Sequence, residues 1–116
     1  MLLMEYQRSE RVGDLLVELI AELLRRDIRD PRLGAVTITA AKVSKDLRHA
    51  RLYFNLLGRR ENKKEALAGL ESATGFIRSK VAKQLKLRFV PTLEFFYDDT
   101  QDEAQRIEDL LKQVKR

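Results

Sequence analysis

The chain has 116 residues, of which 44% are hydrophobic and 35% charged, and its formal net charge is +5. This length predicts a single domain over residues 1–116, and the positive charge favours a nucleic acid or another anionic partner, although plain soluble domains often carry a similar excess. Because the chain has no cysteine, disulfides, thiolate catalysis and cysteine zinc sites are excluded, and we expect a soluble cytoplasmic protein without cofactor, metal or membrane span.

Residues 1–8 are predicted to form a short flexible arm, and the helical pattern begins at Ser9, which suits the N-cap position. Apolar residues then recur at spacings of three and four, which is typical of a helix with one buried face. These residues are Val12, Leu15, Leu16, Leu19, Ile20, Leu23 and Leu24. The helix should end near Asp27, because the segment Asp30–Gly34 supplies a proline stop and a glycine turn.

Two alternating apolar segments follow and predict an antiparallel pair of strands. The first covers residues 36–43 and changes parity before Val43, which indicates a bulge near Ala40–Ala41. The second covers residues 50–56, and Ser44–Asp46 forms the turn between them.

A polar loop is expected at Gly58–Glu61, and Asn62 with Glu65 resembles a capping box at the start of a short helix. That helix should bury Ala66, Leu67 and Leu70. The small residues Ala73-Thr74-Gly75 then predict a break, after which a second helix covers residues 76–85.

A third strand is predicted over residues 88–97, with Phe89, Leu93, Phe95 and Tyr97 on one side. Pro91 cannot donate to a strand ladder, so this part of the strand should be an edge or a bulge. A final helix follows, capped by Asp98–Gln101, with an apolar stripe of Ile107, Leu110, Leu111 and Val114. The element order is therefore α-β-β-α-α-β plus a C-terminal helix, which predicts a two-layer α+β domain with helices on one face of a three-stranded sheet.

The strongest functional signal is a run of uncompensated positive charge. No acidic residue occurs between Glu71 and Glu94, whereas residues 94–109 hold seven acids and one arginine. The cations of this run are Arg78, Lys80, Lys83, Lys86 and Arg88. Charges segregated in this way predict a surface that binds a polyanion through phosphates. The alternative is a solvated face on which lysine stems cover apolar surface.

Catalytic signatures are missing from the sequence, so an enzyme is not expected. His49 is the only histidine and fits a turn or surface position, and neither a nucleophile elbow nor a P-loop occurs. The acidic group Asp98, Asp99, Asp102 and Glu103 could hold magnesium in a nuclease, but capping of the last helix explains it better.

The element order is also that of a type II KH domain, a module that clamps single-stranded nucleic acid with a G-x-x-G loop. No G-x-x-G occurs in this chain, and Ala73-Thr74-Gly75 stands in its place. With this segment and four others, the chain resembles the bacterial ribosome-binding factor A family along nearly its whole length. The five matching segments are Arg8–Val12, Asp30–Gly34, Asp46–Ala50, Leu70–Arg78 and Arg88–Phe95.

The resemblance implies a KH-like fold with an Ala-x-Gly kink, and a monomer that binds the 30S subunit and its 16S rRNA near the decoding region during late maturation. It also implies roles in 16S rRNA 5′-end processing and in growth at low temperature, without catalysis. We expect the basic run to be the main contact surface, with Arg8 and Arg11 as auxiliary contacts and Arg48 and His49 contributing from the adjoining turn. An adaptor that binds an acidic protein is the alternative, because segregated charge fits it as well.

Overall fold

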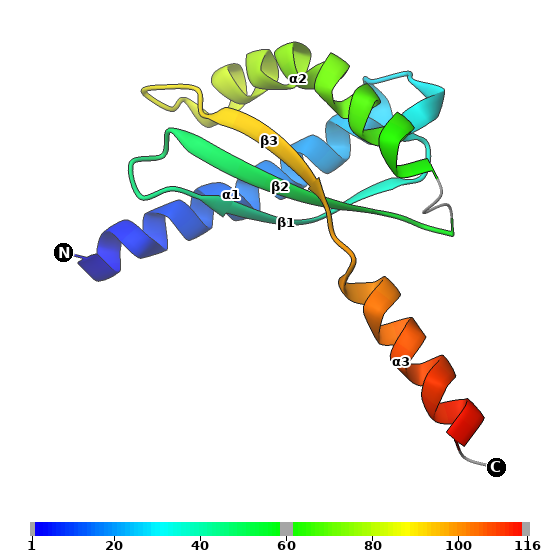
Figure 1. Ribbon diagram of the computed structural model, residues 1–116. Coiled ribbons are helices and arrows are strands. Elements are labelled where there is room, and N and C mark those ends of the chain that lie inside the picture. The colour runs from blue at the N-terminus through cyan, green and yellow to red at the C-terminus, as the bar shows by residue number, and fades with distance from the viewer. Residues whose placement is uncertain (1, 59–61, 115–116) are drawn as a thin grey trace.

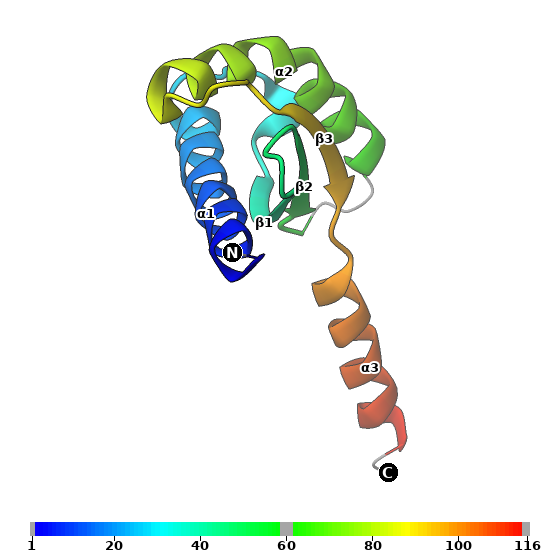
Figure 2. The same cartoon turned by 90° about the vertical axis from the view of Figure 1, so that its left-hand side faces the viewer.

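The computed structural model describes residues 2–58 and 62–114, and it is a two-layer α+β structure, as predicted (Figure 1). In chain order its elements are α1 (Leu2–Arg26), the 3₁₀ helix η1 (Pro31–Leu33), β1 (Val36–Val43), β2 (His49–Leu56), α2 (Lys63–Leu85), β3 (Thr92–Tyr97) and α3 (Thr100–Val114). Residues 59–61 of the expected polar loop lie outside the described residues. Figure 2 shows α1 and α2 on one side of the sheet, with the other side open.

The sheet has the strand order β1-β2-β3. β1 pairs antiparallel with β2, as predicted, and its register shifts between Ile38 and Ala40, next to the expected bulge. β3 pairs in parallel with β2, so that His49 lies opposite Thr92 at the amino-terminal ends of both strands. This parallel pairing brings the β1–β2 turn beside the loop that precedes β3.

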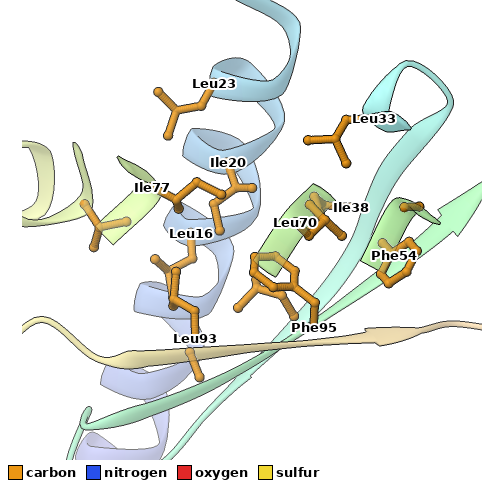
Figure 3. Packing of buried hydrophobic residues seen from close by; sticks show 14 of the residues in the cluster. Leu16, Ile20, Leu23, Leu33, Ile38, Phe54, Leu70, Ile77, Leu93 and Phe95 are labelled. Carbon is orange, nitrogen blue, oxygen red and sulfur yellow. The ribbon is translucent and has the colours of Figure 1, made fainter. Parts of the chain in front are cut away.

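The core lies between the sheet and the two helices that cover it (Figure 3). On α1 the buried hydrophobic residues are Val12, Leu16, Ile20 and Leu23, whereas Leu15 is 47% exposed. The sheet contributes alternate side chains, which include Leu52 and Phe54 from the central strand. The helical and strand periods read from the sequence therefore identify the core faces correctly.

The amino-terminal prediction is wrong in one respect. The arm expected over residues 1–8 belongs to α1 from Leu2 onward, and Ser9 is a buried residue inside the helix rather than its N-cap. A serine within a continuing helix carries no boundary information by itself, because its cap preference is realised only where the backbone leaves the helical conformation.

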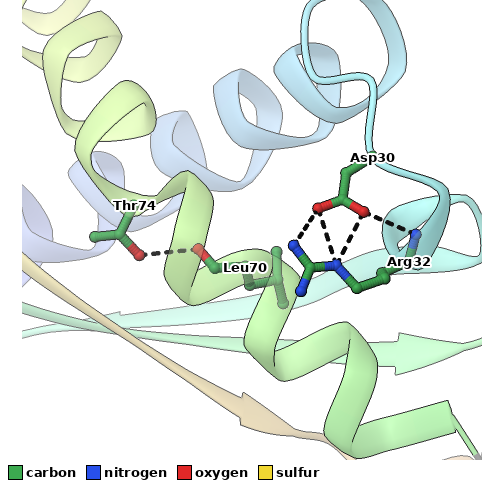
Figure 4. Close-up of polar contacts among 4 residues, drawn as sticks. All are labelled: Asp30, Arg32, Leu70 and Thr74. Carbon is green, nitrogen blue, oxygen red and sulfur yellow. Dashed lines mark hydrogen bonds and ion pairs between the residues drawn. The ribbon is translucent and has the colours of Figure 1, made fainter.

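The two helices predicted around Ala73-Thr74-Gly75 are one continuous helix, α2, which arches over the sheet (Figure 1). The Thr74 hydroxyl donates a hydrogen bond of 2.9 Å to the Leu70 carbonyl one turn earlier, a contact often found in bent helices (Figure 4). The capping box is also wrong, since the Asn62 side chain makes no capping hydrogen bond.

The Asp30–Gly34 segment docks against α2 at Gly69. A Cβ added at Gly69 would lie 2.9 Å from Leu33 Cδ2 and 3.3 Å from Asp30 Oδ2, so a larger residue here would force the buried Leu33 side chain to shift. Asp30 accepts the Arg32 backbone N–H and pairs with the Arg32 guanidinium at 2.7 Å (Figure 4). These bonds from Arg32 lower the pKa of the Asp30 carboxyl. The motif thus has a structural role.

α3 leaves the body at the end of β3 and buries none of its residues (Figure 1). Asp98 joins it to the sheet: Oδ2 accepts the Thr39 hydroxyl at 2.7 Å and Oδ1 accepts the Thr100 N–H at 3.0 Å. Hydrogen bonds from Thr100 and Thr39 lower the pKa of this carboxyl. The predicted cap is therefore present, whereas the apolar stripe from Ile107 to Val114 is exposed and lies outside the core.

Candidate nucleic-acid interface

The β1–β2 turn presents Arg48 and His49 at one end of the sheet. Asp46 Oδ1 accepts the Ser44 hydroxyl at 2.6 Å and the Arg48 backbone N–H at 3.0 Å. These two bonds lower the pKa of the Asp46 carboxyl, so it stays ionised throughout the neutral range. Leu47 occupies the left-handed region with φ of 61° and packs against the core, which ties the turn to the body.

The loop between α2 and β3 is anchored by Arg78. Its Nε donates to the Pro91 carbonyl at 3.0 Å and its Nη2 donates to the Val90 carbonyl at 3.1 Å. The Thr92 N–H donates to the Arg48 carbonyl at 2.9 Å, which joins this loop to the β1–β2 turn. Arg78 was predicted as a phosphate contact, and the structure places its guanidinium half-buried on the loop backbone.

Two predicted cations from distant parts of the sequence meet at Phe89. The Arg48 Cζ lies 4.6 Å from the ring centroid and the Arg88 Cζ lies 5.4 Å from it. Phe89 was expected inside the third strand, on the same side as Leu93 and Phe95. The strand begins only at Thr92, and Phe89 is 50% exposed. Pro91 was the signal that could have moved the predicted start of the strand, because proline cannot donate to the ladder and is often found where a strand begins.

The remaining cations of the run lie along and just beyond the last turns of α2. Lys83 and Lys86 are exposed, and Lys80 is half-buried with its Nζ 5.4 Å from the Phe76 ring centroid. Within residues 2–58 and 62–114, none of these three lysines forms a salt bridge. Their charges are therefore available to an external anion.

The auxiliary pair Arg8 and Arg11 is exposed on the amino-terminal part of α1. A Cβ at nearby Gly13 would lie 3.3 Å from the Ala41 carbonyl of β1, so this part of α1 packs close to the β1–β2 turn. Figures 1 and 2 show the start of α1, that turn and the α2–β3 loop at the same end of the molecule. Of the predicted kink residues, Ala73 packs on the core, Thr74 bonds to Leu70, and Gly75 is exposed with open space around it.

Acidic residues gather at the other end of the molecule, on α3 and the end of β3 (Figure 1). Tyr97 donates to Asp102 at 2.7 Å and Arg106 pairs with Glu103 at 2.6 Å. Among the described residues, no group of three or more His, Cys, Asp or Glu side chains is placed to hold a metal ion. No described helix is both long and apolar enough to cross a membrane. The acidic residues after β3 therefore lie away from the basic run, which precedes β3 at the opposite end of the sheet (Figure 1).

At Lys86, the residue that favours the stability of the fold differs from the residue that favours anion binding. It ends α2 in the left-handed conformation, with φ of 50°, which costs a residue other than glycine about 1 kcal/mol. We expect Lys86→Gly to raise the free energy of unfolding by roughly that amount, because glycine adopts this conformation without strain. The same variant should bind anions more weakly, and thermal unfolding together with an RNA-binding titration measures both effects. A Lys86→Gly protein that is less stable would contradict this account.

Arg78 permits a test that separates structural support from charge. Arg78→Lys keeps the charge but cannot reproduce two parallel N–H donors aimed at neighbouring carbonyls. We expect it to lower the free energy of unfolding by about 1–3 kcal/mol, the cost of leaving partly buried carbonyls unpaired. Urea unfolding measures this loss, and Lys83→Arg is the matched control on an exposed site. Unchanged stability would mean that the backbone contacts of Arg78 are dispensable.

Comparison with known proteins gives consistent matches. A family model described as ribosome-binding factor A matches residues 8–111. The ribosome-binding factor A of Geobacter metallireducens is 48% identical over 109 residues, covering 94% of this chain and 92% of that protein. The Halothermothrix orenii protein of the same name is 40% identical over 112 residues, covering 97% and 92%.

Structures of the same family are similar to this chain in fold. The crystal structure of ribosome-binding factor A from Thermus thermophilus has a TM-score of 0.67 at 27% identity, covering 77% of this chain and 94% of that one. A homology model of the Thermus thermophilus factor, as fitted into a cryo-EM map of its complex with the 30S subunit, has a TM-score of 0.61 at 28% identity and covers 74% of this chain and 90% of that one.

Proposed function

Because the chain belongs to the ribosome-binding factor A family, we propose that it binds the 30S ribosomal subunit by contacting 16S rRNA phosphates. The observation that carries this proposal is the set of cations gathered at one end of the fold. They come from α2, the α2–β3 loop and the β1–β2 turn, and the three lysines are free of salt bridges with described residues. The fitted Thermus thermophilus complex supports the same partner.

The contact set that we propose has a centre and a margin. Lys80, Lys83, Lys86, Arg88 and Arg48 form the centre, and Arg78 supports the loop that carries Arg88. His49, with Nδ1 2.9 Å from Thr92 Oγ1, borders the centre, as do Arg8 and Arg11. Each phosphate neutralised releases counterions, so five contacts imply that a fourfold rise in salt weakens binding roughly 500-fold.

Co-sedimentation with purified 30S, 50S and 70S particles at low and moderate salt tests this proposal. We expect the protein to sediment with 30S particles at low salt and to leave them as salt rises. Failure to sediment with any particle would overturn the proposal. Binding that survives ribonuclease digestion of the particles would favour the alternative, an adaptor that binds an acidic protein.

The finer role that we propose is in late 30S maturation in the cytoplasm, near the decoding region, as a single-domain monomer without catalytic activity. Through this role the protein would promote processing of the 16S rRNA 5′ end and growth in the cold. Deleting its gene should cause 5′-extended 16S precursor to accumulate and slow growth at low temperature. Primer extension detects the precursor, and a deletion strain that processes 16S rRNA normally would refute this part.

A further inference from the structure

The end of the molecule that carries Lys80, Lys83, Lys86, Arg88 and Arg48, here called the cationic end, also holds the exposed aromatic ring of Phe89. Single exposed apolar residues are common and need no explanation by themselves. This ring, however, lies within 4.6 Å of the Arg48 guanidinium carbon and within 5.4 Å of the Arg88 one, and half of its residue surface is exposed. Two guanidiniums and a phenyl ring thus form one surface of stacking groups, drawn from two different loops.

Hydrogen bonds fix the backbone that carries Phe89 and Arg48. Arg78 donates to the carbonyls of Val90 and Pro91, the two residues that follow Phe89. Pro91 is itself fully buried. The Thr92 N–H donates to the Arg48 carbonyl, so the loop carrying the ring and the turn carrying the first arginine are joined. A ligand that stacks here meets groups already in place and loses less binding energy to ordering them.

We infer that Phe89, with Arg48 and Arg88, is a stacking site for an unpaired nucleobase of the bound RNA. Bases stack on phenyl rings and on guanidinium planes, and the arginines can also contact the phosphates beside the base. A base inside an A-form helix is already stacked on its neighbours and cannot reach such a site. The inference rests on the proposed function and narrows it to a segment of rRNA with at least one unpaired nucleotide at this end of the protein.

Other exposed phenylalanines lack this arrangement. Phe96 is 39% exposed on the open face of the sheet, where Tyr53 lies beside it and Arg51 is 5.8 Å from its centroid. Phe76 is 42% exposed, and among the cations of the described residues Lys80 lies over its ring at 5.4 Å. Phe96 is therefore a matched control, because it has similar exposure and one cation but lies outside the cationic end.

The test compares two probes of equal length. One is a single-stranded RNA that carries one 2-aminopurine, and the other is the same strand annealed to its complement. The wild type should bind the single strand more tightly and quench the 2-aminopurine by stacking. Phe89→Leu should weaken single-strand binding about 5- to 150-fold, which is the range expected for losing one stacked base. It should also abolish the quenching. Its binding to the duplex, which depends on phosphates, should be unchanged.

Two variants complete the design. Phe89→Tyr should retain the preference and the quenching, and Phe96→Leu should behave like the wild type. Thermal unfolding of Phe89→Leu verifies that the variant is folded. The inference is overturned if Phe89→Leu keeps its single-strand preference and quenching, or if Phe96→Leu loses them equally.

The same proteins sedimented with 30S particles separate this inference from the proposed function. If the wild type sediments with 30S particles but Phe89→Leu binds and quenches the single strand as the wild type does, the stacking site is overturned and the proposed function stands. If the wild type quenches the probe base but does not sediment with 30S particles, the proposed function is overturned and the stacking site stands. Wild type that binds neither RNA probe overturns the stacking site whatever its sedimentation.

Discussion

Replacing Lys80, Lys83 and Lys86 together by glutamate should abolish binding to 30S particles. At about 0.1 M salt, the counterions released by three phosphate contacts contribute roughly 500-fold to the binding constant, and reversing the charges adds repulsion. Lys83 and Lys86 are exposed and Lys80 is half-buried. None of the three forms a salt bridge with described residues, so the fold should be retained. Co-sedimentation at several salt concentrations measures the loss.

A matched control separates this effect from net charge. Arg25, Lys64 and Lys112 are exposed cations on α1, the start of α2 and α3. Reversing either set of three changes the charge by −6, from +5 to −1. We expect the control variant to keep most of its 30S affinity. Equal loss in both variants would mean that binding depends on overall charge rather than on the cationic end.

Leu52→Ala should cost about 2–5 kcal/mol of the free energy of unfolding, a large fraction of the 5–15 kcal/mol typical of a domain. Leu52 is 0% exposed on the central strand β2, with Ala41 on one side and Phe95 on the other. Its removal leaves a cavity that neighbours on both sides cannot fill, because each is held by strand pairing. The melting temperature should fall by roughly 10–20 °C.

The chain offers the same substitution at an exposed site nearby. Leu57 follows the end of β2 and is 66% exposed. Leu57→Ala should change stability by no more than about 0.5 kcal/mol. Calorimetry on both variants measures the difference, and a Leu52→Ala protein as stable as the control would show that the core under β2 is not as described.

The sequence by itself determined the layers of the fold. Apolar spacing on α1 marked Leu16 and Ile20, and alternation on β2 marked Leu52 and Phe54, all of which are buried. These periods are local and repeat over many residues, so the buried face can be recognised even where one residue departs from the pattern. The net positive charge of the run from Arg78 to Arg88 was equally visible, since it depends on composition alone.

Boundaries were less well determined, because weak local signals compete with tertiary contacts. Ala73-Thr74-Gly75 favours a break, yet the cost of one glycine in a helix is only about 1 kcal/mol. Leu70 and Ile77, on either side of that segment, are both 0% exposed on the same face of α2. Burying both from one continuous helix outweighs the local preference, and a similar argument applies to the helix that continues through Ser9.

The composition of the site was decided by tertiary structure. Arg48 and Arg88 are forty residues apart, and they share the Phe89 ring only because β2 and β3 pair in parallel with their amino-terminal ends together. Strand order and direction arise from long-range packing, which no local pattern encodes. Arg78 likewise could be recognised as a cation from the sequence, but its hydrogen bonds to the loop backbone follow from the distance between α2 and β3, which only the folded chain defines.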